Sequence, residues 1–154
     1  MPKCYQLIGV PGAGKSTWIK NQDWAKDLPV VSTDNFVEAY AKEQGKTYNE
    51  VFKEYMPVAV KLMANQAKIC EANGLDVIWD QTSTTYISRK RKFNTLPKYE
   101  HIAVVFRTPD ADELAKRLAS RPGKNIPKHV MDQMINGFEM PTEDEGFTEI
   151  WYAA

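Results

Sequence analysis

Short apolar runs alternate along the chain with segments that have helical patterns. Five runs have the length and composition of buried strands, at residues 4–8, 29–32, 75–79, 101–106 and 148–152. The segments with helical patterns lie between them, at 16–26, 35–44, 49–72, 109–119 and 127–138. Strands that alternate with helices favour a mostly parallel sheet covered by helices. The pattern therefore predicts an α/β three-layer sandwich around a mostly parallel five-stranded sheet.

Individual residues predict how two of these helices begin and end. Asp34 is the expected N-cap of the helix over 35–44, because a short polar side chain there accepts bonds from free backbone amides. The helix over 49–72 is the longest, and Gly74 is expected to close it. Pro57 lies inside that segment and would split or kink it, since proline has no backbone N–H.

The end of the first apolar run carries the strongest chemical motif. The next residues fill every fixed position of the pattern G-x-x-x-x-G-K-[ST]: Gly9-Val10-Pro11-Gly12-Ala13-Gly14-Lys15-Ser16. In such a loop the backbone amides close around phosphate oxygens, Lys15 reaches the terminal phosphates and the Ser16 hydroxyl binds Mg²⁺. The alternative is a glycine-rich turn with a surface lysine. The expected phosphate-binding residues are Gly12, Ala13, Gly14, Lys15, Ser16 and Thr17.

Two acidic residues follow strands, where parallel sheets place their ligands. Asp34 comes after the second apolar run and would act as a general base towards an attacking hydroxyl, or serve only as a helix cap. Asp80 comes after the third run and would take part in metal binding, or form a turn with the neighbouring hydroxyl residues.

Basic residues occur at two further places. The run 88–92 contains Arg89 and Lys92, which would share one face of a helix. This face would be exposed to solvent, or it would bind a phosphate of the acceptor. Arg117 and Arg121 lie four residues apart before a Gly/Pro turn, which suits a mobile lid that brings a guanidinium to the transferred phosphoryl group. The alternative for Arg117 is a surface pair with Glu113.

Composition narrows the class of protein only slightly. Lys+Arg and Asp+Glu both number 20, so there is no overall basic field, although a local basic patch would be enough to bind nucleic acid. Cys4 and Cys70 are expected to be small core residues of a reducing compartment and not a disulfide. No apolar run has the length of a membrane span, and no signal-peptide pattern is present. We expect a cytoplasmic protein with no membrane partner; its oligomeric state is not predicted.

Taken in order, these motifs resemble the kinase domain of 5′-hydroxyl polynucleotide kinases of the bacteriophage and animal DNA-repair type. Residues 9–17 are similar to that family's G-x-P-G-x-G-K-S-T, and 77–91 to its strand-D-x-T-N segment with downstream arginines. Arg117-x-x-x-Arg121 resembles its lid, at about 112–137, and 138–147 is similar to its F-E-x-P-T-x-x-E-G-F tail. The resemblance implies that residues 1–154 form a single P-loop kinase domain with a helical lid.

The resemblance also implies a function. A member of this family would use ATP and Mg²⁺ to phosphorylate the 5′-hydroxyl end of DNA or RNA. Asp34 falls where the family has its general base, and Lys15 and Arg121, with Arg117, would stabilise the transferred group. The acceptor would contact Asp34, Asp80, Thr82 and Arg89.

The acceptor end of the pattern departs from the phage relatives. Thr33 and Val37 stand where those relatives have arginines, one of which holds the 3′-phosphate of the acceptor nucleotide, and Ser83 replaces an asparagine. Two alternatives therefore accompany the first hypothesis. One is a kinase for the hydroxyl of a small molecule or of a hydroxymethylated base; the other is a non-catalytic ATP-binding switch or toxin-like module.

Overall fold

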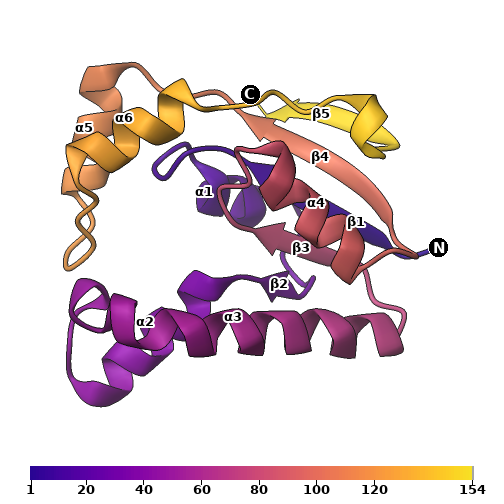
Figure 1. Cartoon of the computed structure of the whole chain (residues 1–154), viewed down its shortest axis with the longest axis horizontal. Helices are drawn as coiled ribbons and strands as arrows, with labels where there is room; N and C mark the ends of the chain where they lie inside the picture. Colours follow the sequence, from indigo (N-terminus) through magenta and orange to yellow (C-terminus); the bar gives the residue numbers. More distant parts are fainter. Residues whose placement is uncertain (154) are drawn as a thin grey trace.

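One parallel sheet organises the chain, of which the computed structural model describes residues 1–153. Its five strands follow the order β2-β3-β1-β4-β5, and every neighbouring pair is parallel (Figure 1). The strands are β1 (Lys3–Ile8), β2 (Val30–Val31), β3 (Val77–Asp80), β4 (Glu100–Phe106) and β5 (Glu149–Ala153). The predicted α/β fold with a five-stranded parallel sheet is confirmed.

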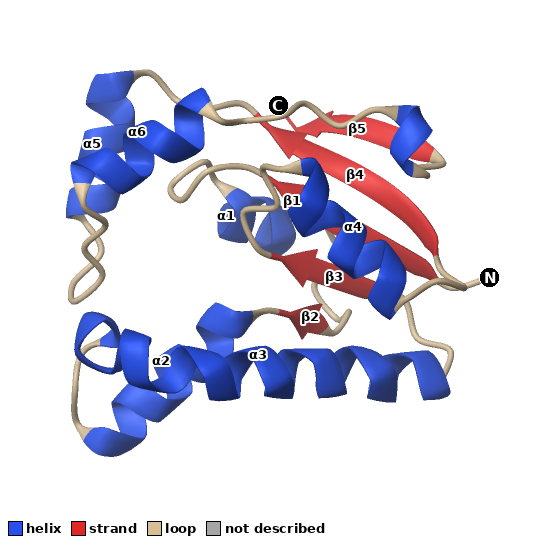
Figure 2. Cartoon of the chain, viewed as in Figure 1, coloured by secondary structure: helices blue, strands red, loops and turns tan. Residues whose placement is uncertain are grey.

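Helices cover both faces of the sheet (Figure 2). Alternate residues of β1 point to opposite faces. Tyr5 and Leu7 pack with residues of α1 (Lys15–Asn21), whereas Cys4 packs with residues of α3 (Tyr48–Ala72) and with Leu96, directly after α4 (Tyr86–Thr95). The two largest apolar clusters of the core thus lie on opposite faces of the sheet.

The remaining helices gather near the carboxyl ends of the strands. They are α2 (Thr33–Gln44), α5 (Ala111–Ala119) and α6 (Lys128–Asn136), and a short 3₁₀ helix, η1 (Glu143–Glu145), precedes β5. In Figure 1, α5 and α6 lie at the upper left and α2 at the lower left. Leu114 of α5 and Met131 of α6 pack on Val10, so the α5–α6 pair rests directly on that loop.

Several helix boundaries differ from the sequence predictions. Helix α1 ends at Asn21, five residues early, and turns cover the segment that follows. Ser32, with extended backbone, occupies the N-cap of α2, so the prediction that Asp34 is the cap is wrong; Asp34 lies in the first turn. Helix α3 continues through Pro57 without a break, and its start is fixed by a reciprocal capping box between Thr47 and Glu50.

Two expectations from composition concern cysteines and membranes. Cys4 and Cys70 are both buried and free, as predicted. Among the helices of residues 1–153, none is both long and apolar enough to cross a membrane.

Candidate active site

A cavity of about 1290 Å³ lies at the carboxyl edge of the sheet. Its walls come mainly from the segments that directly follow β1, β2 and β3, from the first turns of α3 and from the lid segment 117–134. Every residue predicted to bind phosphate, metal or acceptor lines this cavity, with the exception of Arg89. The fold therefore brings together side chains that are up to about a hundred residues apart in the sequence.

The glycine loop wraps around the Lys15 side chain at one end of the cavity. Gly12 and Gly14 have positive φ angles of 85° and 100°, which other residues adopt at a cost. The Lys15 ammonium donates to the backbone oxygens of Gly9, at 2.7 Å, and Val10, at 3.4 Å. Burial lowers the pKa of Lys15 to about 8, and the negative charges of nearby carboxylates oppose the shift. The hydrogen-bond partners of this cation are two neutral carbonyl oxygens. Charged phosphate oxygens would bind it more strongly than these carbonyls do.

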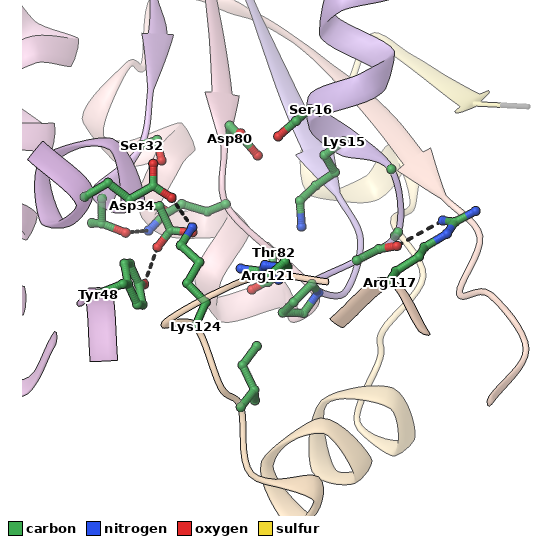
Figure 3. Close-up of a pocket in the computed structure, with 18 of the residues that line it drawn as sticks. Lys15, Ser16, Ser32, Asp34, Tyr48, Asp80, Thr82, Arg117, Arg121 and Lys124 are labelled. Atoms are coloured by element: carbon green, nitrogen blue, oxygen red, sulfur yellow. Dashed lines mark hydrogen bonds and ion pairs between the residues drawn. The ribbon is translucent and has the colours of Figure 1, made fainter. Parts of the chain in front are cut away.

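Ser16 and Asp80 supply oxygen ligands next to Lys15. Both side chains point into the same space in the close-up of the cavity (Figure 3). Burial raises the pKa of the Asp80 carboxyl, and the Lys15 ammonium acts in the opposite direction. A hydroxyl and one carboxylate, with phosphate oxygens to complete the shell, are the donor set that Mg²⁺ prefers in nucleotide sites. The residues present thus fit a Mg²⁺ bound through Ser16, with Asp80 beside it.

Asp34 faces the same cavity from the opposite wall. The hydroxyl of Tyr48 donates to Asp34 Oδ1 at 2.5 Å. Burial and this bond to Asp34 raise the pKa of Tyr48, which keeps the phenol protonated and able to donate at neutral pH. Since Tyr48 occupies one carboxylate oxygen, the other is left for an incoming hydroxyl. Sequence reasoning missed Tyr48, although the Thr47–Glu50 capping pattern identifies it as the first residue of α3.

The turn between α5 and α6 lies over Tyr48. Lys124 forms an ion pair with Glu38 of α2, and its ammonium lies 4.6 Å from the centre of the Tyr48 ring. Asn49 and Asn125 exchange two hydrogen bonds of 2.8 and 2.9 Å between side chain and backbone. The turn is therefore tied to the first residues of α3, on the side of the cavity where Asp34 lies. Neither Glu38 nor Lys124 had been singled out from the sequence.

The two lid arginines have different surroundings. Arg117 pairs with Glu113 at 2.9 Å and also donates to the Gly12 backbone oxygen at 3.0 Å, so the surface pair and the contact with the glycine loop coexist. Arg121 lines the cavity and forms no ion pair among residues 1–153. Burial is the larger cause of the pKa shifts of both Lys15 and Tyr48, and the positive charge of Arg121 acts to lower both pKa values.

Arg89 lies outside the cavity, and its prediction as an acceptor contact is corrected. The side chain has 0% of its surface exposed. Its guanidinium donates to both carboxylate oxygens of Glu145, at 2.8 and 3.3 Å, and to the Ser83 backbone oxygen at 2.8 Å. Lys92, on the same face of α4, is buried as well. Both cations point into the protein and not towards solvent or substrate, so Arg89 connects α4 to the C-terminal segment.

Arg89→Met is expected to lower the free energy of unfolding by about 3 kcal/mol, because it leaves the Glu145 carboxylate without its partner. Urea denaturation measures the change. Arg91→Met, at an exposed position of the same helix, is the control and should change it by less than about 0.5 kcal/mol. An Arg89→Met protein of normal stability with a raised acceptor KM would restore the acceptor role.

The fold and the cavity together define a nucleotide-binding P-loop protein of the kinase type. Residues 6–141 match the family model described as AAA domain, and the chain belongs to this family.

Solved structures support the same class. A Chloroflexus aurantiacus protein assigned as a kinase aligns with a TM-score of 0.70 at 17% identity, over 99% of this chain and 87% of that one. A chain of the Pnkp1/Rnl/Hen1 RNA repair complex aligns at 0.65 and 25% identity, over 88% of this chain and 43% of that one. Shikimate kinase from Acinetobacter baumannii aligns at 0.58 and 16% identity, over 100% and 84%. The matched kinases include enzymes with small-molecule substrates, so the P-loop kinase fold does not determine the acceptor.

Proposed function

We propose that this protein is a Mg²⁺- and ATP-dependent kinase that transfers the γ-phosphate to a hydroxyl group. One observation carries the proposal: the Asp34 carboxylate, bonded to Tyr48, faces the same cavity as the glycine loop with its half-buried Lys15. The loop amides and Lys15 would hold the β- and γ-phosphates, and Ser16 would bind Mg²⁺. The free oxygen of Asp34 would accept the proton of the attacking hydroxyl.

Two classes of acceptor have support. The 5′-hydroxyl of a DNA or RNA end is supported by the order of motifs and by the 25% identity to a chain of the Pnkp1/Rnl/Hen1 RNA repair complex. The hydroxyl of a small molecule or of a hydroxymethylated base is supported by the formal net charge of zero and by the full burial of Val37, where phage relatives have an arginine. A non-catalytic ATP-binding module would have no need of a carboxylate held opposite the glycine loop.

The direct test is transfer of labelled γ-phosphate from ATP. The acceptors are DNA and RNA oligonucleotides with 5′-hydroxyl ends, a nucleoside, its 3′-monophosphate, and duplex DNA with hydroxymethyl bases. We expect label on at least one hydroxyl, and the labelled position identifies the class of acceptor. ATP binding without transfer to any of them would contradict the kinase proposal and favour a non-catalytic module.

Tyr48→Phe is expected to lower kcat by about tenfold with little change in the KM for ATP. A hydrogen bond to a charged group contributes about 1.5–3 kcal/mol, and part of that would be lost from the orientation of Asp34. Tyr40→Phe is the matched control: Tyr40 is on α2, stacks on Tyr55 and does not line the cavity. Equal kcat in both variants would remove Tyr48 from the positioning of the base.

A further inference from the structure

We propose that the acceptor half of the cavity accepts a hydroxyl carried by an uncharged group with an apolar face. In this proposal the Glu38–Lys124 pair excludes acceptors that carry a phosphate close to the reacting hydroxyl. The inference rests on the proposed phosphotransfer and adds to it the chemical class of the acceptor. The inference distinguishes the two acceptor classes by whether a phosphate lies close to the reacting hydroxyl.

Most of the cations that line the cavity already have bonded partners. The charged side chains that line it are Lys15, Arg117, Arg121 and Lys124, and the carboxylates of Asp34, Glu38 and Asp80. Lys15 and Arg117 are bonded to the glycine loop, and Lys124 is paired with Glu38. Among the described residues Arg121 is thus the one cavity cation without such a partner, and the proposed phosphotransfer assigns it to the transferred phosphoryl group. Within residues 1–153, no other unpaired cation lines the cavity.

Glu38 makes the acceptor wall unfavourable for an anion. It lies one helical turn after Asp34, so the two carboxylates share a face of α2. Lys124 neutralises Glu38 and is held over the Tyr48 ring at 4.6 Å. An acceptor phosphate at this wall would have to take Lys124 away from Glu38, or lie beside the Asp34 carboxylate without a cation of its own. Like charges brought together in a binding site cost several kcal/mol.

Residue 37, where the phage relatives have an arginine, does not supply a cation to the cavity either. Val37 is 0% exposed and packs with Ala41 and Val51 in the cluster between α2 and α3. An arginine at residue 37 would not fit this cluster without rearrangement. The residues of α2 that line the cavity are Thr33, Asp34, Asn35 and Glu38, and none of them is a cation.

Apolar side chains supply the rest of the acceptor wall. Phe52 and Met56 project from α3, and Val130 and Met134 project from α6 on the lid side. Phe52 is 41% exposed although it lies beside the cavity, so it has an open ring face. Such surfaces favour planar or apolar groups, including a sugar face or a pyrimidine ring, and contribute nothing to holding a phosphate.

A matched pair of acceptors tests the charge of this site. Thymidine and thymidine 3′-monophosphate differ only in the phosphate, and we expect kcat/KM to be at least about tenfold higher for thymidine. Glu38→Gln removes one carboxylate and frees Lys124, so it should reduce this preference by about tenfold. Glu43→Gln removes a carboxylate from an exposed position of the same helix that lies outside the cavity, and should leave the ratio as in the wild type.

Two further acceptors distinguish the sources of an uncharged hydroxyl. A hydroxymethylpyrimidine nucleoside represents a free small molecule, and duplex DNA with the same base represents a polymer. Transfer to the free nucleoside alone indicates a small-molecule kinase, whereas preferential transfer to the duplex indicates that the base is presented by DNA. Both outcomes support an uncharged acceptor.

Calorimetric binding of the same nucleosides to the protein with ADP and Mg²⁺ gives a readout that does not need turnover. If thymidine binds more tightly than its 3′-monophosphate and Glu38→Gln reduces the difference, but no label is transferred, the acceptor class stands and the phosphotransfer proposal is wrong. If label goes preferentially to the 3′-monophosphate, or Glu38→Gln behaves as Glu43→Gln, the kinase proposal stands and the charge inference is wrong. Failure of both uncharged nucleosides and of the hydroxymethyl duplex to bind or react would also overturn it.

Discussion

Arg121→Ala is expected to lower kcat by about 10³–10⁵, the contribution of an arginine that stabilises a transferred phosphoryl group. Arg121 lines the cavity and has no ion-pair partner in residues 1–153, so its guanidinium is available to the reacting group. The KM for ATP should change much less than kcat, because the charge on that group develops mainly in the transition state. Steady-state kinetics with saturating acceptor measures both constants.

Two variants control this result. Arg107→Ala removes an exposed arginine after β4 that does not line the cavity, and should leave kcat near the wild-type value. Arg121→Lys retains the charge but loses the planar fork, so it should recover only part of the lost rate. If Arg121→Ala reduces kcat less than tenfold, Arg121 is a lid residue without a part in the chemistry.

The sheet and the glycine loop could be predicted from the sequence because their signals are local. A buried strand such as 4–8 is a continuous apolar run, and the loop after it has fixed residues at fixed spacing. The edge at which Lys15, Asp34 and Asp80 meet follows from the parallel order, since side chains after parallel strands share one edge. The phosphate end of the cavity was therefore accessible without a structure.

The acceptor end was not accessible, because its contacts join residues that are far apart in the sequence. Asp34 was assigned as a helix cap on local propensity, but Ser32 takes that position and Asp34 bonds to Tyr48, beyond the α2–α3 turn. Lys124 reaches Glu38 only when the α5–α6 turn lies over α3. No periodicity or motif in either segment predicts that pairing.

Arg89 shows a second limit of sequence reasoning. Its shared face with Lys92 was predicted correctly, but helical spacing does not tell whether a face points to solvent, to a ligand or to the core. The deciding partner is Glu145, which lies 56 residues further along the chain. Arg89 was therefore interpreted as a phosphate contact, because its actual partner, the Glu145 carboxylate, could not be found from the local sequence.

Asp34→Asn is expected to lower kcat by about 10²–10⁴, the usual contribution of a general base, while the affinity for ATP stays near that of the wild type. The amide is nearly isosteric with the carboxylate and keeps an oxygen that can accept from Tyr48, so the wall of the cavity should retain its shape. Single-turnover kinetics and ATP titration separate the two effects. Glu43→Gln, which removes a carboxylate from an exposed site on α2, is the control for charge alone.

A double variant tests whether Tyr48 acts through Asp34. In the wild type, Tyr48→Phe should cost about tenfold in kcat because the base loses its orientation. In the Asp34→Asn background no base remains to be oriented, so the same change should cost less than about twofold. Coupling of this kind is expected for residues in direct contact, whereas independent sites give additive effects. Additive losses would mean that Tyr48 contributes to the cavity separately and that Asp34 is not held for catalysis by its hydroxyl.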